Sequence, residues 1–251
     1  MSWLRVYGVR GLAASVPGPV HPVPQPPAAT PQPAPVVRLP GLIGAAPEVI
    51  ADRLRSLIAM LANDDSGSMQ PPHGTDPHGA RYAACHAVLG LMRRHGGGRA
   101  GVVHWGDTAP AELALAPVPV RRRRRQLERA LAIRPQLGGT DPAVALARVR
   151  QLVPVIAPDE TFAVLLLTDG QDRGPSLEQE LEALPAGTVH LVLVDPSGNC
   201  WGQEAAWRAL PWGSFTRLDS FDPQRVAVAS GAALARAIGL ELTTDPTHPK
   251  K

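Results

Sequence analysis

Residues 57–68 read Leu-Ile-Ala-Met-Leu-Ala-Asn-Asp-Asp-Ser-Gly-Ser. The first six are apolar without alternation, which is the pattern of a strand buried on both faces. The last five place carboxylate and hydroxyl oxygens at alternate positions directly after that strand. Such oxygens suit a hard divalent cation such as Mg²⁺, which prefers octahedral oxygen coordination and keeps several waters. The stretch therefore predicts a buried strand that leads into a cation-binding loop.

The length and composition of the chain predict one domain with appendages. A chain of 251 residues can bury one substantial core, and its 44% hydrophobic and 19% charged residues are typical of a soluble globular protein. Many of its prolines lie between Val16 and Pro40, where the composition favours a solvated polyproline II arm. We expect a largely disordered, Pro-rich arm at 1–46, a domain at 47–240 and a polar, basic tail at 241–251.

Other features exclude several classes of protein. No apolar run approaches the roughly 20 residues of a membrane helix. Arg5 and Arg10 interrupt the N-terminus before a signal-peptide core could form. Cys85 and Cys200 are too few for a disulfide scaffold and lack the spacing of a zinc site. We expect a cytoplasmic protein with two free thiols and no membrane partner.

Strand and helix patterns alternate along the rest of the chain. Further buried strands are predicted at 101–105, 162–167, 188–194 and 214–218, with an edge strand at 112–115. Helices are predicted at 47–55, from Asp76-Pro77 to before Gly96, from Arg121 to before Pro135, from Asp141-Pro142 to about 152, from a Ser176/Gln179 capping box to 184, around Trp207, and from Asp222-Pro223 to about 238. This order predicts an α/β domain with a doubly wound, mostly parallel central sheet flanked by helices.

Three polar motifs follow predicted strands. They are the loop that begins at Asp64, the turn Trp105-Gly106-Asp107, and Thr168-Asp169-Gly170. Ligands of open α/β sheets bind outside the carboxyl ends of the strands. We therefore expect these three loops to converge on one edge of the sheet.

The motifs, taken together, resemble a known family. Asp64-x-Ser66-x-Ser68, a Gly-Gly-Thr140-Asp loop before a helix, and Thr168-Asp169-Gly170 are similar to the von Willebrand factor type A (vWA) domain with its metal-ion-dependent adhesion site (MIDAS). The stretch 102–109 is similar to that family's second strand and turn, where an aromatic residue commonly precedes a small residue and an Asp. The resemblance covers about residues 56–240 and implies a Rossmann-like vWA fold with a site for Mg²⁺, or for Mn²⁺ or Ca²⁺.

The resemblance also implies a role for each metal-site residue. Ser66 and Ser68 would be direct ligands, Thr140 would bind directly or through water depending on state, and Asp64 and Asp169 would act largely through water. Asp65 lies off this alternation, so we expect it to be a solvated turn residue. A cation held in this way seeks one more anionic oxygen, and a Glu or Asp of a partner protein would supply it. The implied function is metal-dependent protein recognition without catalysis.

Five residues are candidates for contact with that partner. Trp105, Asp107 and Trp201 are expected at the metal edge, and Arg121 and Arg122 begin a run of five arginines. The run also raises the hypothesis of nucleic-acid binding. A net charge of +3 and the absence of interleaved aromatic residues favour a solvated helix start over nucleic-acid binding, with an acidic protein partner as a further alternative.

An enzymatic role has little support in the sequence. The serine motif lacks the Gly-x-Ser-x-Gly elbow, and Asp64-Asp65-Ser66 lacks the Asp-x-Asp spacing of aspartyl phosphatases. His73, His78 and His104 are expected to be solvated loop residues. Related vWA domains act as binding subunits beside AAA-type ATPases in chelatase and MoxR-associated systems. A second hypothesis is therefore an ATPase-partnered subunit in a bacterial stress, defence or metal-insertion assembly.

Overall fold

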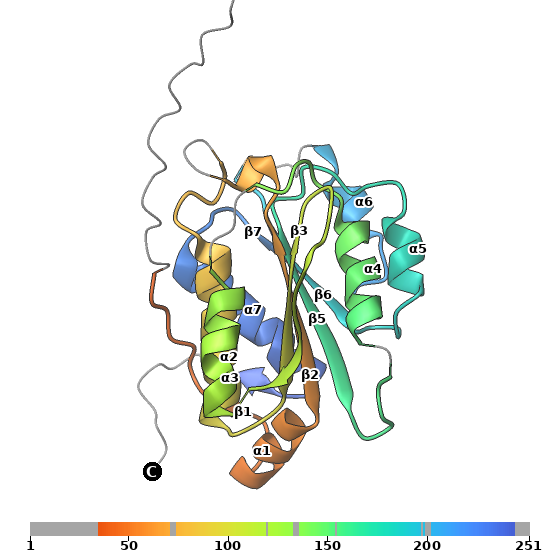
Figure 1. Ribbon diagram of the computed structural model, residues 1–251. Helices are drawn as coiled ribbons and strands as arrows, with labels where there is room; N and C mark the ends of the chain where they lie inside the picture. Colours follow the sequence, from red (N-terminus) through yellow and green to blue (C-terminus); the bar gives the residue numbers. More distant parts are fainter. Residues whose placement is uncertain are drawn as a thin grey trace, which may run out of the picture. The chain divides into compact units, whose positions relative to one another are not determined.

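A six-stranded sheet forms the centre of the domain (Figure 1). The structure, a computed structural model, describes residues 35–70, 74–118, 120–132, 136–153, 155–196, 198 and 202–243. The strand order is β4-β3-β2-β5-β6-β7, and every neighbouring pair is parallel except β3 and β4. The strands are β2 (Leu57–Asp64), β3 (Arg99–Trp105), β4 (Ala111–Pro117), β5 (Thr161–Thr168), β6 (Val189–Val194) and β7 (Ser214–Leu218). The predicted doubly wound, mostly parallel sheet is confirmed.

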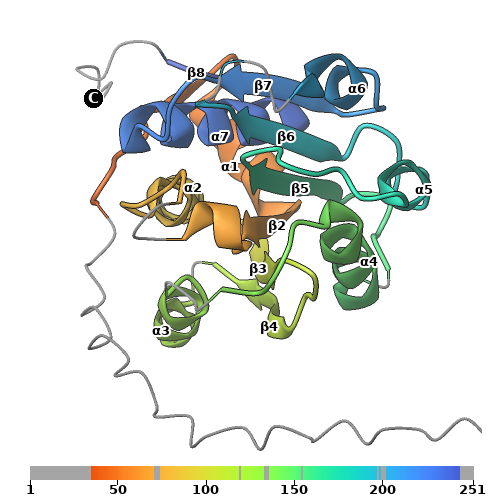
Figure 2. The same cartoon turned by 90° about the horizontal axis from the view of Figure 1, so that it is seen from above.

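Helices cover both faces of this sheet (Figure 2). One face carries α2 (Ala80–Arg94), α3 (Arg121–Ala130) and α7 (Pro223–Ala237), and the other carries α4 (Pro142–Leu152), α5 (Leu177–Glu182) and α6 (Glu204–Arg208). All eight residues of β2 are buried: Leu57, Ala59 and Leu61 belong to the core under α2 and α7, and Ile58, Met60 and Ala62 belong to the core under α4. This two-sided burial explains why the strand is apolar without alternation.

The helix starts follow the predicted caps with two differences. Asp141 and Asp222 are N-caps whose carboxylates accept backbone N–H groups in the first turns of α4 and α7. Asp76, by contrast, precedes α2 by a turn, and its carboxylate accepts the N–H of Ala80 at 2.7 Å from outside the helix. Ser176 is the N-cap of α5 but makes no side-chain cap bond, so the predicted capping box is wrong.

The folded region extends beyond the predicted domain limits. Strand β1 (Leu42–Ile43) pairs antiparallel with β8 (Glu241–Leu242), beside α1 (Pro47–Arg55). Leu39 and Leu42 are buried in the core that α7 covers. Residues 35–46 therefore pack as part of the domain, whereas the rest of the Pro-rich arm, residues 1–34, lies outside the described residues.

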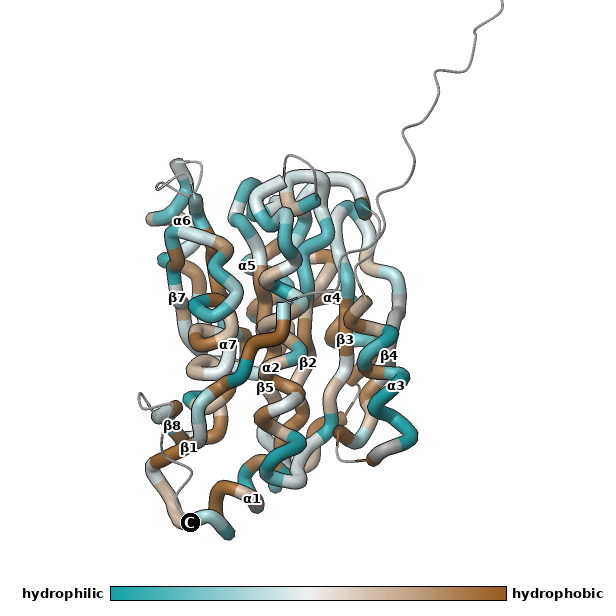
Figure 3. Tube along the Cα trace, turned by 90° about the vertical axis from the view of Figure 1, so that its left-hand side faces the viewer, coloured by the Kyte–Doolittle hydropathy of each residue, from teal (hydrophilic) through white to brown (hydrophobic). Residues whose placement is uncertain are grey.

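The hydropathy of the chain follows this layering. Figure 3 shows hydrophobic residues along the central strands and a hydrophilic run along α3. Cys85 is a buried free thiol in α2, as predicted, and burial raises its pKa to about 12; Cys200 lies outside the described residues. In the part of the chain that the structure describes, no helix has the length and apolar character needed to cross a bilayer.

Candidate metal centre

Asp64, the last residue of β2, is fully buried and held at both carboxylate oxygens. Its Oδ1 accepts the backbone N–H of Ser66 at 2.9 Å, and its Oδ2 accepts the hydroxyl of Thr168 at 2.6 Å. Thr168 ends β5, the parallel neighbour of β2. The carboxyl ends of adjacent parallel strands thus bring Asp64 and the Thr168-Asp169-Gly170 motif together, as the sequence predicted.

The two serines of the loop lie side by side, next to the second carboxylate. The hydroxyl oxygens of Ser66 and Ser68 are 3.1 Å apart, across the short 3₁₀ turn Gly67–Met69. Ser68 is also hydrogen-bonded to the buried Asp169, which accepts the hydroxyl of Thr75 at 3.0 Å. Thr75 was not predicted, and its place in a polar, proline-rich segment held no signal for it.

The loop that carries Thr140 packs against the serine loop. The backbone N–H of Gly67 donates to the carbonyl of Gly138 at 2.9 Å. The exposed Asp107 places its carboxylate over the Gly-Gly pair: a Cβ on Gly138 would lie 2.2 Å from Oδ2, and one on Gly139 would lie 2.5 Å from Oδ1. Only glycines permit this approach, and the half-buried Thr140 follows directly. The three predicted loops therefore meet at one edge.

The ionised forms of Asp64 and Asp169 are destabilised at this buried site. Burial raises the pKa of Asp64 to about 7, with a further contribution from the negative charge of Asp169, and hydrogen bonds from Ser66 and Thr168 offset part of the effect. Burial likewise raises the pKa of Asp169, although hydroxyl and backbone hydrogen bonds lower it in part. Two buried carboxylates that repel each other form an environment that a cation would stabilise.

The residues present fit a hard divalent cation. Their donors are all oxygens: two carboxylates and the hydroxyls of Ser66, Ser68 and Thr140. Across the described ranges, no group of three or more His, Cys, Asp or Glu side chains is placed to hold a metal. A site here therefore depends on hydroxyl ligands, which suits Mg²⁺ better than softer metals. That these five residues hold a cation stays a prediction.

Asp65 differs from its prediction as a solvated turn residue. Its side chain is fully buried, and its Oδ1 accepts the Nη2 of Arg81 at 2.8 Å and the hydroxyl of Tyr82. Its Oδ2 lies 2.6 Å from Nδ1 of His104. His104 is also fully buried, in β3, so its prediction as a solvated residue is wrong as well. The residues around Asp65 come from α2 and β3, which sequence neighbours do not reveal.

The predicted partner contacts divide into several cases. The prediction of Trp105 as a direct partner contact is wrong, because its side chain is fully buried in the core under α4. Asp107 is exposed at the metal edge, although its carboxylate also supports the Thr140 loop. Trp201 and His73 lie outside the described residues, and His78 is exposed.

The arginine run lies at the other end of the sheet. Pro117, the last residue of β4, pairs with Arg99, which begins β3, and α3 starts four residues later. Asp64 pairs with Trp105, which ends β3. Arg121 and the exposed Arg122 therefore begin α3 far along the strands from the metal edge, so they are not part of a surface centred on Asp64.

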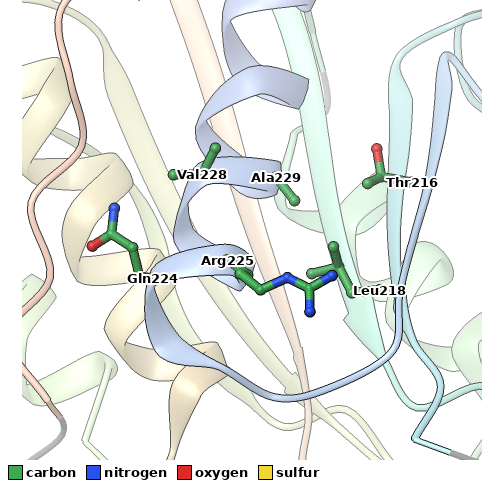
Figure 4. Close-up of a pocket in the computed structure, with 6 residues that line it drawn as sticks. All are labelled: Thr216, Leu218, Gln224, Arg225, Val228 and Ala229. Carbon is green, nitrogen blue, oxygen red and sulfur yellow. The ribbon is translucent and has the colours of Figure 1, made fainter. Parts of the chain in front are cut away.

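A pocket lies elsewhere, between the edge strand β7 and α7 (Figure 4). Its cavity volume is about 370 Å³, and its lining residues are Thr216, Leu218, Gln224, Arg225, Val228 and Ala229. Two strands, β5 and β6, separate β7 from β2 in the sheet. The pocket therefore contributes no residue to the candidate metal centre.

Comparison with known proteins places this geometry in a fold family. No family model and no curated protein matches the sequence. Among solved structures, the pilus adhesin SpaC from Lactobacillus rhamnosus GG matches with a TM-score of 0.56 and 16% identity, over 73% of this chain and 30% of the adhesin. Proximal thread matrix protein 1 from the mussel byssus, in a form with a zinc-occupied MIDAS motif, matches with a TM-score of 0.53 and 17% identity, over 77% of this chain and 48% of that protein.

BatB from Bacteroides thetaiotaomicron matches with a TM-score of 0.50 and 13% identity, over 72% of this chain and 98% of the BatB structure. This chain spans less than half the length of the adhesin and byssus structures that it matches. Identities of this size establish the fold alone. The chain therefore has the von Willebrand factor type A fold.

Proposed function

We propose that this chain is a metal-dependent protein-interaction module that binds a partner carboxylate at a MIDAS-type site. The observation that carries the proposal is the convergence of two buried carboxylates, Asp64 and Asp169, on the paired hydroxyls of Ser66 and Ser68. The zinc-occupied MIDAS motif of the byssus protein supports divalent-metal binding by this kind of fold. Mg²⁺ is the cation that we propose here.

The residues of the site have separate tasks in this proposal. Ser66, Ser68 and Thr140 would hold the cation, and Asp64 and Asp169 would act largely through water. The hydrogen bonds to Asp64 and Asp169 keep both carboxylates oriented toward the serine hydroxyls. When bound, the cation supplies a coordination position for an Asp or Glu oxygen of the partner.

Recognition, rather than catalysis, is the proposed task of this site. The hydroxyls of Ser66 and Ser68 hydrogen-bond to each other and to the two carboxylates. The buried imidazole of His104 uses both ring nitrogens on other groups, Asp65 and the carbonyl of Ala130. His104 is therefore not placed to activate either serine as a nucleophile.

A pull-down with the full chain as bait tests the proposal. We expect partners to be captured in Mg²⁺ and lost in chelator or with Asp64→Asn, while calorimetry shows Mg²⁺ or Mn²⁺ binding to the wild type and none to Asp64→Asn. Asp172→Asn is the matched control, because Asp172 is an exposed carboxylate in the loop after Asp169. Capture of the same partners under all of these conditions would contradict the proposal of metal-dependent binding.

The same experiment separates the narrower alternatives. An AAA-type ATPase that is captured in Mg²⁺ and lost in chelator would identify the ATPase-partnered assembly. Nucleic acid that binds regardless of chelator, with a steep salt dependence that is lost on neutralising Arg122 and its neighbours, would instead identify the arginine run as the functional surface.

A further inference from the structure

A buried cluster of charged residues lies directly beside the metal loop. The Asp65 cluster consists of Asp65, Asp76, Arg81, Tyr82 and His104, and each of these side chains is at most 1% exposed. Arg81 bridges the two acids, with Nη2 at 2.8 Å from Asp65 and Nη1 at 2.7 Å from Asp76. Burying acidic and basic side chains together is costly unless they are closely paired. The free-energy cost of burying these groups indicates that the cluster has a role besides filling the core.

His104 extends the cluster to helix α3. Its Nδ1 lies 2.6 Å from Oδ2 of Asp65, and its Nε2 faces the carbonyl oxygen of Ala130, the last residue of α3. His104 therefore contacts Asp65 with one ring nitrogen and the end of α3 with the other. The imidazole joins the metal loop to α3 through these two directional contacts.

Asp65 also ties together the segments that form the metal centre. Its N–H donates to the carbonyl of Trp105 at 2.7 Å, and its carbonyl accepts the N–H of Leu137 at 2.9 Å. Leu137 directly precedes the glycines of the Thr140 loop, and Asp65 itself stands between Asp64 and Ser66. A shift of the Asp65 backbone would therefore move the neighbouring metal-site residues on both sides, and the side-chain contacts of Asp65 with Arg81 and His104 hold that backbone in place.

We propose that Asp65 and His104 are positioning residues that set the affinity of the metal site and couple it to helix α3. The inference rests on the proposed metal-binding function and adds its regulation. The Ala130–His104–Asp65 hydrogen bonds connect the end of helix α3 to the metal loop. Coupling of this kind is reciprocal, so metal binding alters α3 as much as α3 alters metal binding.

Two substitutions of one residue separate the two hydrogen bonds of His104. The amide of Asn reaches about as far as Nδ1, so His104→Asn keeps the bond to Asp65 and loses the bond to Ala130. The longer Gln reaches about as far as Nε2, so His104→Gln keeps the bond to Ala130 and loses the bond to Asp65. Asp65→Asn removes the negative charge at the centre of the Asp65 cluster at nearly constant side-chain volume.

Calorimetric titration with Mg²⁺, repeated with Mn²⁺, measures the first part of the proposal. We expect Asp65→Asn and His104→Gln to weaken cation binding by about ten- to a hundredfold, the usual effect of changing a residue that orients metal ligands. His104→Asn should weaken it by less than about threefold, because the contact with Asp65 remains. Near-ultraviolet circular dichroism and a melting curve identify the variants that remain folded.

Amide hydrogen exchange of residues 121–132, with and without saturating Mg²⁺, measures the coupling. We expect Mg²⁺ to slow exchange at the end of α3 in the wild type and to leave it unchanged in both His104 variants. If Asp65→Asn does not fold, the His104 pair still carries the test.

The outcomes distinguish the inference from the function on which it rests. A wild-type chain that binds neither Mg²⁺ nor Mn²⁺ overturns the proposed function and the inference together. A wild type that binds the cation, with His104→Gln binding equally tightly or with α3 exchange indifferent to Mg²⁺, overturns the inference and leaves the function standing.

Discussion

The protonation of Asp64 makes the stability of the metal-free protein depend on pH. Its pKa is raised from 3.8 to about 7, chiefly by burial and then by the charge of Asp169. Between these two values the folded chain holds a proton that the unfolded chain has released. The free energy of unfolding contributed by Asp64 therefore falls as pH rises through this interval, and is constant above and below it.

The first prediction follows from that sign. In chelator, wild type should lose more stability between about pH 5 and about pH 7.5 than Asp64→Asn, as measured by urea unfolding at each pH. The exposed control Asp172→Asn should follow the wild type. Parallel pH profiles for wild type and Asp64→Asn would show that Asp64 does not titrate in this range.

The second prediction concerns Gly138 in the Thr140 loop. Its φ of 88° lies in the left-handed region, and an added Cβ would lie 2.2 Å from Oδ2 of Asp107. Gly138→Ala should destabilise the fold by more than the roughly 1–2 kcal/mol of the backbone conformation alone and should weaken Mg²⁺ binding.

Gly187→Ala is the matched control for that prediction. Gly187 has a φ of 76° with no other atom within 4 Å of an added Cβ, so it carries the backbone cost without the clash. Unfolding in urea measures both variants, and adding Asp107→Ala to Gly138→Ala should restore part of the loss. Equal losses of unfolding free energy in Gly138→Ala and Gly187→Ala would mean that the Asp107 carboxylate moves aside freely.

At the scale of single elements, the helix caps give the third prediction. The carboxylate of Asp222 accepts the N–H of Arg225 at 2.8 Å at the start of α7, whereas Ser176 makes no side-chain cap bond at the start of α5. Asp222→Ala should cost about 1 kcal/mol of unfolding free energy, and Ser176→Ala should stay within about 0.5 kcal/mol. Chemical denaturation would contradict this if the two losses were similar.

The same contrast explains what could be predicted about the elements. Asp-Pro pairs marked the starts of α4 and α7 correctly because capping and proline geometry are local. The pair Asp76-Pro77 marked the start of α2 three residues too early. Its carboxylate is drawn instead to Arg81 and to the first N–H groups of the helix, and that geometry exists only after the surrounding loop has folded.

At the scale of the whole molecule, the fourth prediction locates the start of the folded domain. Leu39 and Leu42 are 5% and 8% exposed, and β1 pairs with β8 near the C-terminal end. A chain that begins at residue 47 should be less stable than one that begins at residue 35 by on the order of 3 kcal/mol or more, since it loses two buried leucines and a strand pairing. Equal melting temperatures would restore the boundary at residue 46.

Local patterns in the chain were sufficient for the parallel sheet and for the loops that meet at its edge. Because β2 is buried on both faces, its sequence is an unbroken apolar run that identifies the strand. Because the carboxyl ends of adjacent parallel strands lie together, the proximity of Asp64 and Asp169 could be predicted from the sequence. The environments of Asp65, His104 and Trp105 required the folded chain. Their neighbours arrive from α2, α3 and α4, and no residue near them in sequence records which side chains those helices would bring.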